Sequence, residues 1–80
     1  MDSKIIGDRI RALMEMKHIK RSSLAKELGV SYNTLTQKLM GRREFGLKDI
    51  IKIKEVLQLD NQTCAELFFE EEFSIMKGKE

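Results

Sequence analysis

Apolar residues recur at helical spacing in five segments of this chain. In the first, residues 3–16, Ile6, Ile10, Leu13 and Met14 lie at i, i+4, i+7 and i+8, which is one face of an amphipathic helix. The pattern predicts an all-α protein, a compact five-helix bundle of one small domain. Its later helices are predicted to begin near Ser22, Ser31, Leu47 and Asn61.

Residues 22–41 contain two of these helices, separated by a tight turn. Gly29 interrupts the first apolar stripe and can adopt the positive φ that a sharp helix end needs. Ser31 can cap the second helix through its side-chain oxygen. Helix, short turn with glycine and helix is the arrangement of a helix-turn-helix, whose second helix enters the DNA major groove. Its predicted internal positions are Leu24, Ala25, Leu28, Val30, Leu35 and Leu39.

The second half of the chain supplies two more helices. Phe45, the one large apolar residue of a charged loop, is predicted to insert into the core. A fifth helix is expected over 61–70, with either Asp60 or Thr63 as its cap. The predicted domain covers residues 1–70, and the acidic and apolar tail 71–80 is expected to fray or to support dimerisation. The apolar positions of the fourth helix are Leu47, Ile50, Ile51, Ile53 and Leu57.

The distribution of charge is more informative than the net charge of +2. Residues 1–54 contain thirteen basic and six acidic side chains, whereas residues 55–80 contain two and seven. A basic body is typical of a nucleic-acid-binding protein, although a solvated helical surface with an acidic end is also compatible with these numbers.

Catalytic and metal chemistry find little support in the sequence. His18 is the only histidine and Cys64 the only cysteine, so neither a metal-ligand cluster nor a nucleophile with a base is in view. Cys64 lies on an apolar helix face, where core packing is the simpler interpretation. No enzyme activity, catalytic residue, metal or cofactor is therefore expected. With no signal-peptide pattern and no apolar run of membrane-spanning length, the sequence predicts a cytoplasmic protein.

The motifs L-A-K-E-L-G-V-S-x-x-T-L and K-L-x-G-R-R-E-F-x-L-K-D-I resemble those of phage-repressor helix-turn-helix proteins. These are the lambda repressor and Cro-like proteins of the XRE family, and the small phage-encoded members are the most similar. The resemblance covers about residues 5–69 and implies a lambda repressor-like DNA-binding domain. Two positions depart from the family pattern, which often has Gln where Arg21 stands and an apolar residue where Lys38 stands.

The resemblance implies which side chains face DNA, and helical geometry independently places four of them opposite Leu35 and Leu39. The four candidate base contacts are Tyr32, Asn33, Thr36 and Gln37. Their amide, hydroxyl and methyl groups suit base edges, and the face contains no carboxylate that would repel phosphate. Ser22 or Ser23 could instead be a helix cap. The candidate phosphate contacts are Arg21, Ser22, Ser23, Lys38, Arg42 and Arg43.

The residues predict a DNA-binding helical domain, and the resemblance implies a phage or prophage-type transcriptional regulator that binds a double-stranded DNA operator. Regulators of this type usually bind two half-sites as dimers, so a homodimer is expected, at least on DNA. Apolar residues beyond the needs of the core, Phe69, Phe73, Ile75 and Met76, are its candidate surface. The alternative is a protein-interaction module, an adaptor or antitoxin-like partner on the same fold, because fold does not determine function.

Overall fold

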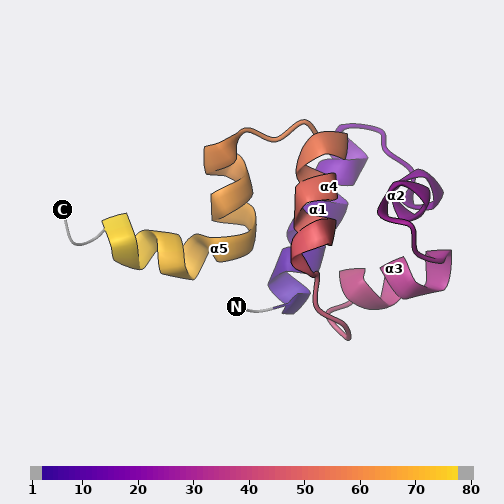
Figure 1. Ribbon diagram of the computed structural model, residues 1–80, viewed down its shortest axis with the longest axis horizontal. Helices are drawn as coiled ribbons and strands as arrows, with labels where there is room; N and C mark the ends of the chain where they lie inside the picture. The colour runs from indigo at the N-terminus through magenta and orange to yellow at the C-terminus, as the bar shows by residue number, and fades with distance from the viewer. Residues whose placement is uncertain (1–2, 78–80) are drawn as a thin grey trace.

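The computed structural model describes residues 3–77, with side chains described for residues 3–69. Within residues 3–77 the chain forms five α-helices and no strand (Figure 1), so the all-α prediction is confirmed. Figure 1 places α3 at one end of the long axis and the last turns of α5 at the other. The helices are α1 Ser3–Met16, α2 Arg21–Leu28, α3 Tyr32–Leu39, α4 Leu47–Val56 and α5 Asn61–Lys77.

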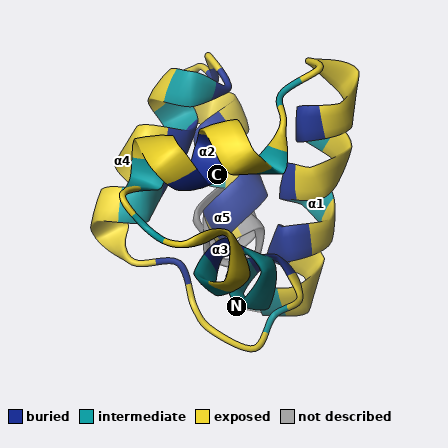
Figure 2. Cartoon of the chain, turned by 90° about the vertical axis from the view of Figure 1, so that its right-hand side faces the viewer, coloured by how far each residue is buried: buried dark blue, intermediate teal, exposed yellow. Residues whose placement is uncertain are grey.

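The core lies between the five helices and is entirely apolar within the described residues. Figure 2 shows that the residues of α1 are buried on the side toward the bundle and exposed on the outer side. Phe45 is buried and meets Phe68 edge to face, with ring centroids 6.2 Å apart, as its predicted role in the core requires. The most completely buried large side chains are Ile10, Leu24, Leu35, Leu39, Ile53, Leu57 and Phe68.

Helix α4 buries fewer apolar side chains than the sequence pattern predicts. Ile50 and Ile53 are buried, but Ile51 is half exposed and Leu47 is 71% exposed. At about 100° per residue, Leu47 and Ile51 share a stripe roughly a quarter turn from the buried one. A short helix on the outside of a bundle covers only one such stripe, so these two of the five apolar positions stay exposed.

Helices α1 to α4 end in the same way, with a residue at positive φ whose amide turns back to the last helical turn. These residues are His18 (φ 56°), Gly29 (φ 70°), Gly41 (φ 82°) and Gln58 (φ 55°). At α1, the amide of His18 donates to the Glu15 carbonyl at 3.2 Å and that of Ile19 to the Met14 carbonyl at 2.8 Å. This pair of bonds is the Schellman motif, which satisfies the terminal carbonyl groups of a helix.

Helix α5 begins at a defined cap and is broken once. The Asp60 carboxylate accepts the Thr63 amide at 2.6 Å, so Asp60 is the cap of the two candidates, and this bond holds the pKa of the Asp60 carboxyl below its ordinary value. The helix breaks at Phe69 (φ −132°, ψ 31°). Just before the break, the guanidinium of Arg9 in α1 donates to the carbonyls of Glu66 and Leu67, at 3.3 and 3.4 Å.

Beyond Phe69, helical backbone continues to Lys77 and leads away from the bundle (Figure 1). The break lies beside the predicted domain boundary between residues 70 and 71. Phe69 is exposed over 39% of its surface, whereas Phe73, Ile75 and Met76 lie outside the residues whose side chains are described. The tail's part in dimerisation stays a prediction.

Candidate nucleic-acid interface

The turn between α2 and α3 has the geometry that the sequence indicates. Leu24 and Ala25 of α2 are buried in the same core cluster as Leu35 of α3, and Gly29 ends α2 in the left-handed region. The Ser31 hydroxyl oxygen accepts the Thr34 amide at 3.0 Å and caps α3. Only residues 29–31 join the two helices, and the last of them already caps α3. Such a short connection restricts the angle between α2 and α3.

Helix α3 is seated on α1 by a close backbone contact. Leu35 and Leu39 are fully buried, and Gly7 of α1 faces the carbonyl group of Leu39. A Cβ atom at residue 7 would lie only 2.0 Å from that oxygen. The close approach of α1 to α3 depends on glycine at residue 7. Apolar periodicity does not reveal this requirement.

The outward face of α3 presents the four side chains predicted to read bases. Tyr32 and Asn33 are exposed, and Thr36 and Gln37 are half-buried. Sequence reasoning missed Met40, which continues the same face one turn beyond Thr36 and Gln37 and is 44% exposed. The helical spacing 33, 36, 37 and 40 was the signal available for it.

Arg21, at the first position of α2, contacts this face directly. Its Nη1 donates to Thr36 Oγ1 at 3.2 Å, and its guanidinium carbon lies over the Tyr32 ring, 5.6 Å from the centroid. The Thr36 hydroxyl in turn donates to the Tyr32 carbonyl at 3.0 Å. Arg21 therefore joins the start of α2 to two candidate base contacts on α3.

Ser22 and Ser23 lie exposed in the first turn of α2. The N-cap of this helix is Lys20, which makes no side-chain capping bond, so neither serine is the cap. Both belong to the first turn of the helix, where an anion is favoured by the unpaired N–H groups and the helix dipole.

Lys38 lies in a different environment from the other basic candidates. Its ammonium group pairs with the Asp49 carboxylate at 2.5 Å, and the two side chains are only 14% and 13% exposed. Lys38 also lies over the Phe45 ring, at 5.9 Å from the centroid. The Asp49 carboxylate additionally accepts the Gly46 amide at 3.0 Å at the start of α4. This ammonium is thus already paired within the domain.

Arg42 and Arg43 are exposed in the loop after α3. Lys4, in the first turn of α1, adds a basic residue beside this loop. Its backbone lies against Gly41, where an added Cβ would be only 2.8 Å from the Lys4 Cα. The Lys4 ammonium also pairs with Asp8 at 3.5 Å. Lys4 and Gly41 are far apart in sequence, so no local pattern could place them together.

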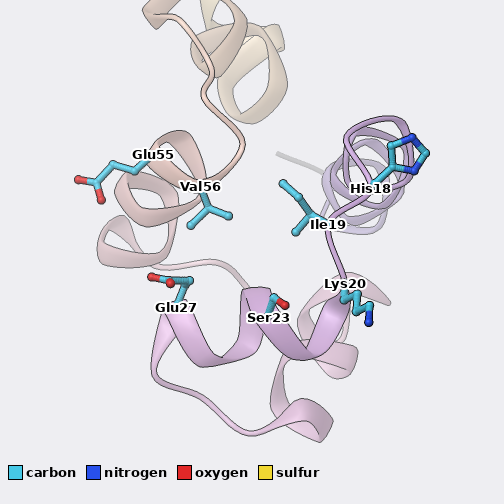
Figure 3. Close-up of a pocket in the computed structure, with 7 residues that line it drawn as sticks. All are labelled: His18, Ile19, Lys20, Ser23, Glu27, Glu55 and Val56. Atoms are coloured by element: carbon cyan, nitrogen blue, oxygen red, sulfur yellow. The ribbon is translucent and has the colours of Figure 1, made fainter.

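An open hollow of about 640 Å³ lies elsewhere on the described surface, between the α1–α2 loop, α2 and the end of α4. Figure 3 shows Ile19 and Val56 pointing into it, with Glu27 and Glu55 on one side and His18 and Lys20 on the other. Its rim carries both signs of charge and no residue of α3 lines it. It is therefore separate from the candidate DNA-binding face.

Cys64 and His18, the residues considered for catalytic or metal chemistry, lie in the core and at a helix end. Cys64 is buried in the core, and burial raises the pKa of its thiol, which disfavours the reactive thiolate. His18 is an exposed helix-ending residue at positive φ. Among the described residues, no three potential metal ligands come together, and no helix in that range is long and apolar enough to cross a membrane.

A helix-turn-helix with a polar, outward-facing second helix defines the class of protein to which this fold belongs. Comparison with known families matches residues 10–60 to the helix-turn-helix family of the XRE type. The match spans more than half of the 80 residues, and the chain belongs to this family, whose membership favours a DNA-binding transcription regulator. Neither the curated proteins nor the solved structures contain a match to the chain.

Proposed function

We propose that this protein regulates transcription by binding a specific double-stranded DNA site, with α3 in the major groove. One observation carries the proposal: α3 turns a polar face without a carboxylate outward, and its apolar face is locked into the core. Tyr32 and Asn33 are open to a ligand, while Leu35 and Leu39 are fully buried. A helix presented in this way can enter a groove without unfolding any part of the domain.

The side chains on this face have complementary recognition chemistry. Asn33 and Gln37 can each form two hydrogen bonds with an adenine edge. Thr36 uses its one donor on the Tyr32 carbonyl and one acceptor lone pair on Arg21. It therefore offers DNA its methyl group and one further lone pair, which suits a thymine methyl. Tyr32 can contact a base or a phosphate.

Phosphate contacts are proposed at both ends of α3. Arg21, Ser22 and Ser23 lie on the α2 side, and Arg42 and Arg43 lie in the following loop. We leave Lys38 out of this set because its ammonium is paired with Asp49. Three of these five contacts come from arginines, and three neutralised phosphates per monomer correspond to a log–log salt slope of about −2.7, at roughly −0.9 for each.

The finer parts of the proposal rest on the resemblance to phage repressors and on general principles. We propose a phage or prophage-type regulator without enzymatic activity that acts in the cytoplasm. A homodimer on two half-sites about one helical turn apart fits the small number of base contacts that one α3 supplies. The protein-interaction alternative has no comparable support, because the family match favours a DNA-binding regulator.

Selection from a library of random duplexes, followed by gel shifts over a salt series, tests this function. We expect enriched sites with two related half-sites, bound at least about a thousandfold more tightly than scrambled duplex. Affinity should fall steeply with salt. An adaptor or antitoxin-like module would enrich no sequence and bind little DNA even at low salt, and this result would refute the proposal.

A further inference from the structure

We infer that Arg21 is a positioning residue for base recognition, and that its role in the interface is more than that of a phosphate contact. This inference rests on the proposed function and identifies what sets the geometry of its reading face. The observation behind it is that one guanidinium joins Thr36 and Tyr32, two of the four candidate base contacts, to α2.

The contacts restrict both side chains before DNA is bound. Thr36 Oγ1 accepts from Arg21 at 3.2 Å and donates to the Tyr32 carbonyl at 3.0 Å, which sets the rotamer of Thr36 and the direction of its methyl group. The planar guanidinium covers the Tyr32 ring at 5.6 Å from its centroid, a separation at which a cation is attracted to the ring face. Tyr32 is 56% exposed, so more than half of its surface remains open to a ligand.

The chemistry of arginine suits this double role. A guanidinium has five donors in a rigid plane, so one can hold Thr36 while others remain for a phosphate and the positive charge lies over the Tyr32 ring. A lysine at this position would retain the charge but not the fixed donor geometry that holds Thr36 and the ring together. Restricting the reading side chains in advance reduces the entropy that is lost when DNA orders them.

A charge-conserving substitution separates positioning from simple phosphate binding. Arg21→Lys keeps the positive charge, so the salt slope should stay near that of wild type, and affinity should fall less for scrambled duplex than for the selected site. The ratio of affinities for the selected site and the scrambled duplex should fall about tenfold. Arg43→Ala is the matched control in the opposite loop, and it should weaken binding to both duplexes alike and lower the salt slope by about one.

Tyr32 also provides a readout in the absence of DNA. It is the only tyrosine and the chain has no tryptophan, so near-ultraviolet circular dichroism and fluorescence at tyrosine wavelengths report on the Arg21 contact without assignment. Arg21→Lys and Thr36→Val should both change these Tyr32 signals in the free protein at unchanged helical content. Arg43→Ala should leave the signals as they are.

The double variant Arg21→Lys with Thr36→Val completes the test. Because Val keeps the shape of Thr but has no acceptor, Arg21→Lys should reduce selectivity by less in this background than in wild type. Additive losses, or undiminished selectivity of Arg21→Lys for a site that wild type clearly prefers, would overturn this inference while the proposed function stands. A library that yields no preferred duplex would overturn both.

Discussion

Lys38 and Asp49 form an ion pair that joins the last turn of α3 to the first turn of α4, 2.5 Å apart and mostly shielded from solvent. The pair spans the loop that carries Arg42 and Arg43. Asp49 also accepts the Gly46 amide, and Lys38 lies over Phe45. The ion pair thus connects the two ends of the loop beside the proposed DNA-binding helix, and the buried Phe45 ring anchors the loop in the core.

Replacing Asp49 of this pair should destabilise the domain more than replacing Lys38. Asp49→Ala removes the partner of a shielded ammonium and the acceptor of the Gly46 amide, and should lower the free energy of unfolding by about 3 kcal/mol. Lys38→Met should cost less, because the Asp49 carboxylate keeps the Gly46 amide. Chemical denaturation measures both, and equal losses would argue that the capping bond contributes nothing.

The reading face should separate into sequence-dependent and sequence-independent parts. Asn33→Ala or Gln37→Ala should lose about 1–3 kcal/mol of binding to the selected site and much less to scrambled duplex. Arg43→Ala should weaken both complexes to a similar degree. Fluorescence anisotropy with both duplexes at one salt concentration makes the comparison. Equal losses for Gln37→Ala on every duplex would contradict base reading at that position.

Gly7→Ala should damage the seat of α3 although alanine is the better helix former. The added methyl would overlap the Leu39 carbonyl oxygen, so α1 and α3 must move apart, at a cost of about 1–3 kcal/mol. Thermal unfolding measures this loss. Asp8→Ala, one residue further on the exposed side of α1, is the control and should have a small effect. A more stable Gly7→Ala protein would show that the contact is looser than described.

The helix ends at His18 and Gln58 can be improved. Both residues hold a positive φ that disfavours a side chain with Cβ, and glycine at a C′ position removes this cost. His18→Gly and Gln58→Gly should each raise the free energy of unfolding by about 0.5–1 kcal/mol, with nearly additive effects because the ends are separate. Gly29→Ala, at the end of α2, should have the opposite sign. Urea unfolding of the three variants compares them.

The Asp60 cap gives stability a defined pH dependence. The bond from the Thr63 amide lowers the folded-state pKa of the Asp60 carboxyl below its unfolded value. The cap therefore contributes fully above the unfolded pKa of about 3.9, and its contribution is lost as pH falls through the lower folded pKa. Asp60→Asn keeps a capping oxygen that does not titrate. The Tm of this variant should fall less than that of wild type between pH 5 and pH 2, and parallel curves would contradict the assignment.

Helix positions and caps were predictable because their determinants are short-range. The spacing of Ile6, Ile10 and Met14 predicted α1, and Ser31 before an apolar stripe predicted the start of α3; both predictions are confirmed. An outward face for Tyr32 and Asn33 followed from the burial of Leu35 on the same helix. Each of these inferences depends on residues within two or three turns of one another.

The contacts that give the reading face its geometry join residues far apart in the chain. Arg21 and Thr36 both suit DNA on composition, and only their proximity shows that Arg21 holds Thr36. Lys38 has the same charge as Arg43, yet packing places Asp49 against it and leaves Arg43 exposed. Such pairings depend on how helices cross in space, because the energy of a charge or a hydroxyl is set by its neighbours and solvent exposure, which spacing along the chain does not encode.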